Sequence, residues 1–196
     1  MLKINLLNLT GYLAAIVIII SLVSFGIQLT GKATDDAVVN ITILQTVSIN
    51  FTIDNIDFGS GSVNLGSDSA TIDTLGNVVD GNWTPVTQGF QVENIGSINL
   101  TLNLKSGKNA ATFLGGTGPG YQYKITDNEA GSCIQADVPL DTWKEVNTTG
   151  DGDLICNPFG FLEDANSVNI NLRLIIPSDA RIGSQLDTFT ATGTST

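Results

Sequence analysis

The chain has 196 residues, with 19 acidic and eight basic side chains, a formal net charge of −11 at pH 7 and no histidine. Such an acidic surface repels nucleic acid and anionic lipid headgroups, which argues against both as partners. Without histidine the chain cannot build a Ser-His-Asp or Cys-His catalytic site or an H-E-x-x-H zinc site, so we expect a protein that is not an enzyme.

The amino-terminal region is the most hydrophobic part of the sequence. No charged residue occurs from residue 4 to residue 31, and the most apolar stretch runs from Tyr12 to Ile27. About 20 residues of helix cross a hydrocarbon core of roughly 30 Å, so this run predicts a single hydrophobic helix. A retained transmembrane anchor and a cleaved signal peptide both agree with its length. Either one divides the chain into residues 1–32 and an exported domain, residues 33–196.

The first exported segment, residues 39–53, has the clearest alternation in the sequence. Its odd positions are apolar except Gln45 and its even positions are polar except Leu44, as in a strand with one buried face. The run exceeds a usual strand of about five or six residues, which leaves two interpretations. A bend at Leu44-Gln45 divides it into two local strands, or it is a strand donated to a neighbouring subunit. The apolar residues of this candidate donor strand are Val39, Ile41, Ile43, Val47, Ile49 and Phe51.

Shorter alternating runs follow, separated by turns rich in Gly, Asn and Asp. The clearest are residues 89–104, 121–125, 167–176 and 186–191. No segment after Leu29 has the i, i+3, i+4 pattern of a helix over three turns. These patterns predict an all-β fold in one domain, an antiparallel β-sandwich with Greek-key or jelly-roll connections.

Cys133 and Cys156 are the two cysteines of the chain, and an even pair in an exported protein usually forms a disulfide. In the chain-entropy model, closing a loop of this size contributes about 3 kcal/mol of stability. The stretch between them has little regular pattern, so we expect an excursion at one end of the sheets. We do not expect the pair to bind a metal, because no histidine can complete such a site.

One acidic triplet could bind a cation. Asp151-Gly152-Asp153 offers oxygen ligands to Ca²⁺ but lacks the spacing and the glutamate of an EF-hand. An Asp-Gly turn explains the same residues. We therefore expect no cofactor, with Ca²⁺ as the one candidate.

Several N-x-Thr triplets are candidate glycosylation sites. Asn40, Asn50 and Asn99 fall on the polar faces of alternating runs, where a glycan would project into water. Asn147 is a further candidate, in the stretch between the cysteines. The alternative is that these Asn and Thr residues only form the polar face of a sheet.

Three segments together carry a resemblance to a known group. They read FGSGSVNL at residues 58–65, GFQVENIGSINLTLNL at residues 89–104 and INLRLIIPSDARIGSQLDTFTATG at residues 170–193. Behind an export segment, this order is similar to the TasA and camelysin group and the related archaeal bundling pili. The resemblance implies a secreted jelly-roll protein that inserts an amino-terminal strand, here residues 38–51, into the next subunit. The metalloprotease-like activity of the camelysin branch does not transfer, because this chain has no histidine.

Archaeal pilins and archaellins are a second comparison, because they also join an apolar amino-terminal helix to a β-sandwich. In those proteins the helices bundle as the filament core. Their processing site places a basic residue and Gly before the apolar run. Here Gly11 precedes Tyr12, but Thr10 occupies the basic position.

The sequence as a whole predicts a structural protein of the cell surface or extracellular space, membrane-anchored or secreted. We expect it to associate with itself as a subunit of a filament or surface coat, through donation of a strand. A membrane-anchored binding or adhesion module, with glycans as ligands, is the first alternative. A pilin-like subunit with a helical filament core is the second.

Overall fold

The computed structural model describes residues 13–15, 35, 37–135 and 139–196. The chain forms two units, residues 1–42 and residues 43–196. In the first unit residues 13–15 are helical; the rest of the predicted hydrophobic helix, and the boundary predicted after residue 32, lie outside the described residues. Within the described part of the chain, no helix has the length and hydropathy needed to cross a membrane.

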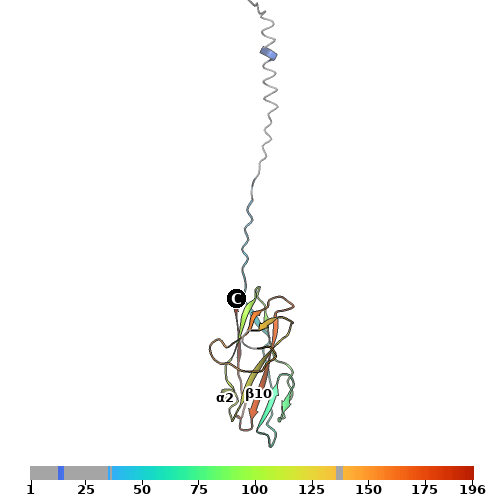
Figure 1. Cartoon of the computed structure of the whole chain (residues 1–196), viewed down its shortest axis with the longest axis vertical. Coiled ribbons are helices and arrows are strands. Elements are labelled where there is room, and N and C mark those ends of the chain that lie inside the picture. Colours follow the sequence, from blue (N-terminus) through green and yellow to red (C-terminus); the bar gives the residue numbers. More distant parts are fainter. Residues whose placement is uncertain (1–12, 16–34, 36, 136–138) are drawn as a thin grey trace, which may run out of the picture. The chain divides into compact units, whose positions relative to one another are not determined.

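The regular secondary structure of the second unit is almost entirely β-strand (Figure 1). In chain order its elements are β1 (Ile49–Ile53), β2 (Ser69–Asp73), β3 (Val78–Val79), β4 (Phe90–Asn94), β5 (Leu100–Ser106), α2 (Ala110–Phe113), β6 (Gly120–Asp127), β7 (Cys133–Gln135), β8 (Lys144–Glu145), β9 (Asp153–Phe159), β10 (Ser167–Pro177) and β11 (Phe189–Ser195). The strands pair antiparallel throughout. The structure confirms the predicted all-β class.

The larger sheet is organised around β10, which has 11 residues. One edge of β10 pairs with β6, and β8 lies beyond β6. The other edge pairs first with β4, through residues 167–170, and then with β2, through residues 173–177. In the gap between these two partners, Leu172 donates its backbone N–H to the side-chain oxygen of Thr74 (3.0 Å). β1 and β3 form the outer strands on this side.

The smaller sheet has the strand order β11-β5-β9-β7. Its inner residues and those of the larger sheet form one hydrophobic core, so the two sheets are arranged like a sandwich. The buried side chains at alternate positions are Leu100, Leu102 and Leu104 of β5 and Val168, Ile170, Leu172 and Leu174 of β10. In these two strands the period-two pattern predicts the buried face correctly.

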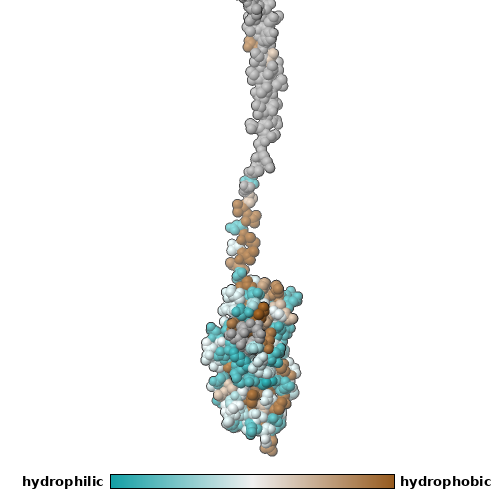
Figure 2. Space-filling view, in the orientation of Figure 1, coloured by the Kyte–Doolittle hydropathy of each residue, from teal (hydrophilic) through white to brown (hydrophobic). Residues whose placement is uncertain are grey.

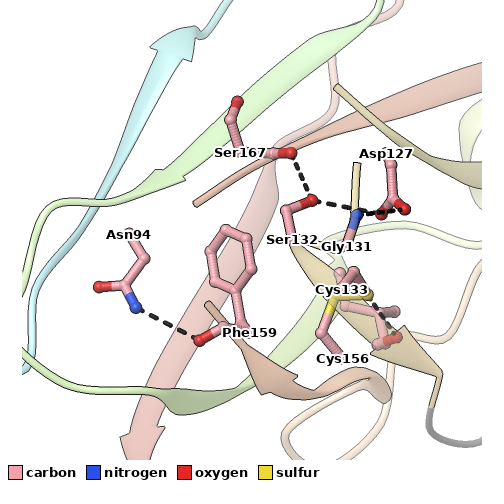
Figure 3. Close-up of a disulfide and its surroundings, with 9 residues drawn as sticks. Asn94, Asp127, Gly131, Ser132, Cys133, Cys156, Phe159 and Ser167 are labelled. Atoms are coloured by element: carbon pink, nitrogen blue, oxygen red, sulfur yellow. Dashed lines mark hydrogen bonds between the residues drawn. A yellow bond between two sulfur atoms is a disulfide. The ribbon is translucent and has the colours of Figure 1, made fainter. Parts of the chain in front are cut away.

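The disulfide between Cys133 and Cys156 is present and joins β7 to β9 (Figure 3). Both cysteines are buried, and no free cysteine remains among the described residues. Next to the bond, Ser132 donates a hydrogen bond from Oγ to the backbone oxygen of Ser167 in β10 (2.7 Å). The bridge therefore lies where the two sheets meet. The presence of a disulfide agrees with an oxidising compartment.

The expectation that residues 133–156 form an excursion at the end of the sheets is wrong. This stretch contains β7 and β8 and the start of β9, and β9 is an inner strand of the smaller sheet. Ile155 and Phe159 of β9 are fully buried. The sequence DLICNPF hides this strand because Asn157 and Pro158 interrupt the alternation.

The long alternating run of residues 39–53 is divided in the structure. Residues 49–53 form β1, where Phe51 pairs with Val92 of β4 and packs against the core. Residues 37–48 belong to no strand, so the first of the two expected local strands is absent. The division lies closer to Thr46 than to the bend expected at residues 44–45. There the chain first bonds to its own domain, because the backbone oxygen of Thr46 accepts a hydrogen bond from the N–H of Ser97 (2.9 Å).

Candidate functional site

An apolar cleft of about 820 Å³ lies at the carboxyl end of β10. It exists because the smaller sheet stops there: β5 ends at Ser106, and its partner β11 begins only at Phe189. Beyond this point α2 and two loops face the larger sheet, and Figure 1 shows α2 beside the carboxyl end of β10. The apolar residues that line the cleft include Ile72, Leu172, Leu174 and Ile176 of the larger sheet and Phe58, Trp83 and Phe113 from the loops and α2.

Aromatic rings hold the inner wall of the cleft together. The ring of Tyr121 lies 4.7 Å from that of Phe113 and 5.8 Å from that of Phe189, between ring centroids. Phe189 in turn lies 5.6 Å from Phe90. Contacts of this kind contribute about 0.5–1.5 kcal/mol each beyond the buried area, so they stabilise the wall.

A partly buried polar network fixes one side of the cleft. Tyr121 donates a hydrogen bond from its hydroxyl to Oδ2 of Asp187 (3.2 Å), and Ser106 donates one to the same oxygen (2.5 Å). Burial, and then the charge of Asp187, raise the pKa of Tyr121 well above its ordinary value. The phenol therefore remains a neutral donor that ties β6 to the segment before β11.

The two rims of the cleft are loops whose backbone is not paired with another strand. Residues 54–61 and residues 182–187 make no backbone–backbone hydrogen bond within the described chain. On the second rim, the side chains of Ile182 and Leu186 are 98% and 80% exposed. The first rim is held by Gly61, where a Cβ would lie 2.4 Å from the ring of Trp83. Each rim therefore offers main-chain donors and acceptors to a further strand.

The candidate donor residues fall into two sets. Val39, Ile41 and Ile43 belong to a segment, residues 38–44, whose large apolar side chains are 77–91% exposed, and the described residues around them appear as hydrophobic surface in Figure 2. Val47 is 43% exposed. Ile49 and Phe51 instead lie in β1 and pack against the core of their own domain. The structure therefore does not bring the six residues together on one surface.

The glycosylation candidates also differ from one another. Asn40, Asn50 and Asn99 are exposed. Asn147 is half-buried, and its side-chain N–H donates to Oδ1 of Asp153 (3.2 Å) while its Oδ1 accepts from the backbone N–H of Thr149 (2.9 Å). A glycan on Asn147 would be attached to the same nitrogen that donates to Asp153, in a half-buried position.

The Asp151-Gly152-Asp153 triplet forms a turn, in which the Gly152 N–H bonds to the backbone oxygen of Thr149 (3.0 Å). Asp153 accepts hydrogen bonds from the hydroxyl of Tyr123 (2.6 Å) and forms an ion pair with Lys144 (2.9 Å). Burial acts to raise the pKa of Asp153, but these hydrogen bonds outweigh it and hold the pKa below its ordinary value. The described residues contain no group of three or more carboxylates or cysteines that could hold a metal ion.

A second, polar hollow of about 370 Å³ was not predicted from the sequence. Lys124, Asn169 and Asp141 line it on the outer face of the larger sheet. Beside it the ring of Trp143 stacks on the guanidinium of Arg173 (4.0 Å) and lies near the ammonium of Lys124 (5.3 Å).

Comparison with protein-family models, with curated proteins and with solved structures gives no match. The function is therefore argued from the sequence and from the geometry described above.

Proposed function

We propose that this protein is a non-enzymatic structural subunit of the cell surface, which associates with copies of itself by donating the segment of residues 38–44 as a strand. One observation carries the proposal: this segment alternates apolar and polar residues, yet its large apolar side chains up to Leu44 are 77–91% exposed. Residues 45–48 connect the segment to β1, which already pairs in the larger sheet.

Exposure of this segment in an isolated chain is unfavourable. Burying one aliphatic side chain contributes about 1.5–3 kcal/mol, and an extended chain with unpaired N–H and C=O groups is a template for strand pairing. Residues 37–45 make no backbone–backbone hydrogen bond in the described structure. A sheet in another molecule would satisfy the backbone and the side chains together.

Several other features support a surface location and this architecture. The disulfide agrees with an oxidising compartment, and the charge-free run of residues 4–31 agrees with an anchor or an export signal. Two antiparallel sheets around one core agree with the jelly-roll implied by the resemblance to the TasA and camelysin group. Glycans on Asn40, Asn50 or Asn99 would project from an exposed position.

Electron microscopy of the purified full chain tests the proposal, with filaments or sheets as the expected result. The variant Ile41→Asp with Ile43→Asp places two charges on the apolar face of the segment and should abolish the assemblies. The variant Asn40→Asp with Thr42→Asp places the same two charges on the polar face and should leave them intact. Assemblies that survive the first pair of substitutions would contradict strand donation.

The polar hollow favours one second candidate, a binding module for glycans. Ammonium, amide and carboxylate groups of Lys124, Asn169 and Asp141 could bond to sugar hydroxyls, next to the indole of Trp143. Binding of neutral oligosaccharides to a monomeric protein, lost in Lys124→Ala with Asn169→Ala, would favour this function. Absence of binding in a screen of oligosaccharides would remove it.

A further inference from the structure

We propose that the cleft at the carboxyl end of β10 is the acceptor site, and that its occupant is the segment of residues 38–44 of a second copy of this chain. The inference rests on the proposed strand donation and adds where the strand goes. In the bound state the segment lies between the two rims, residues 54–61 and residues 182–187.

The backbone of the cleft and that of the segment are complementary. Both rims are loops without backbone–backbone partners among the described residues, and residues 38–44 are also unpaired. A strand placed between such rims gains hydrogen bonds on both of its edges, as in strand addition to a sheet. In the single chain a few of these groups already bond to side chains, namely the Gly59 N–H and the backbone oxygens of Gly183 and Leu186. The others have no partner within the described residues, so their pairing with a strand is additional to apolar burial.

The side chains are complementary as well. Val39, Ile41 and Ile43 project from one face of an extended segment and span about 13 Å. The floor beneath them is formed by Ile72 and the inner face of β10. The cleft volume, about 820 Å³, lies within the range of pockets that enclose a ligand, about 300–1,000 Å³.

The absence of charged residues makes this segment a better donor than other parts of the chain. Residues 37–53 carry no charged side chain, whereas the whole chain has a net charge of −11. Two acidic domains repel each other at close range, so an uncharged segment is suited to bridge them.

The attachment of the segment at Thr46 keeps Ile41 and Ile43 away from the carboxyl end of the cleft in their own copy. Thr46 is attached at Ser97, beyond the end of β4 that pairs with Ser167, whereas Leu174 lines the cleft toward the carboxyl end of β10. Seven residues of β10 separate these levels by about 23 Å. Ile41 is five residues from Thr46, so it reaches about 17 Å at most. The attachment point at Thr46 and the carboxyl end of the cleft therefore lie at opposite ends of β10, which favours a head-to-tail assembly that does not close on itself.

Mixing two blocked variants of the full chain tests the assignment. The donor-blocked variant carries Ile41→Asp and Ile43→Asp, and the acceptor-blocked variant carries Ile182→Asp and Leu186→Asp. Ile182 and Leu186 are almost fully exposed, so their substitution should leave the fold intact, which circular dichroism of each variant verifies. Mass photometry then measures the species present before and after mixing.

Each variant alone should lose at least tenfold of its assembled fraction, and a one-to-one mixture should give a dimer of the two variants and no longer species. A control with Leu65→Asp and Leu162→Asp, two exposed positions outside the cleft, should assemble as the unmodified chain does. Assembly of the acceptor-blocked variant alone, or no dimer in the mixture, would overturn the acceptor site. Assembly of the donor-blocked variant alone would overturn the proposed function itself.

Discussion

β10 and the segment of residues 38–48 carry similar alternations of apolar and polar residues, but their surroundings are opposite. Val168, Ile170, Leu172 and Leu174 are buried between two sheets, whereas the apolar side chains of residues 38–44 are exposed. Alternation therefore shows that a strand needs an apolar partner surface, and it does not show that the partner belongs to the same molecule. The predictions below test this difference, from the largest expected effect to the smallest.

The two regions should respond differently to the same substitution. Ile170→Ala removes a fully buried side chain and should lower the free energy of unfolding by about 2–5 kcal/mol. Ile41→Ala should change it by less than about 0.5 kcal/mol, because the side chain is exposed in the single chain. Urea denaturation of dilute, unassembled protein measures both. Equal losses would mean that the segment packs on its own domain.

The disulfide belongs to the buried region and should behave accordingly. Replacing both Cys133 and Cys156 by Ala should lower the free energy of unfolding by about 3 kcal/mol, because the unfolded chain gains conformational freedom. Reducing agent should have little effect on the folded protein, since both sulfurs are buried. The midpoint of urea denaturation measures the loss. An unchanged midpoint would contradict a stabilising role.

Substitution of two glycines compares the cost of adding a side chain at a packed position and at an open one. Gly152 has φ +88°, and a Cβ there would lie 2.0 Å from the backbone oxygen of Leu104; Gly66 has φ +92° and nothing within 4 Å. Gly66→Ala should cost about 1 kcal/mol from backbone strain alone, and Gly152→Ala about 2 kcal/mol or more. Thermal unfolding of the two variants gives the difference. Equal shifts would mean that β5 yields at Leu104 without loss.

Acid should weaken the folded domain through Asp153. Its pKa is lower in the folded chain than its ordinary value, so its contribution is complete above about pH 4 and is lost as the pH falls through the folded pKa. Asp153→Asn should lower the melting temperature at neutral pH and reduce its decline on acidification. Asp151→Asn, at an exposed neighbouring position, is the matched control. Identical acid profiles for Asp153→Asn and the unmodified chain would contradict this role.

The sequence predicts the inner strands well, because their burial depends on local alternation. β5 and β10 have uninterrupted apolar faces, and the pairing of the two cysteines follows from their number. β9 escapes the pattern because Asn157 and Pro158 interrupt it, although Ile155 and Phe159 are fully buried.

The cleft could not be predicted for a different reason. Phe58, Trp83 and Phe113 stand in turn-rich sequence, and they meet only because the smaller sheet ends where the larger one continues. The one available signal was the presence of isolated aromatic residues among Gly and Ser. Likewise, the spacing of an N-x-Thr triplet does not show that the amide of Asn147 is already bonded to Asp153.

The placement of Thr46 and of the cleft at opposite ends of β10 gives any fibre built in this way a polarity. Its two ends are chemically different, since one presents an unfilled cleft and the other presents the exposed apolar segment of residues 38–44. A molecule that blocks either tip would stop elongation there, so fibre length could be set by the supply of such a terminator.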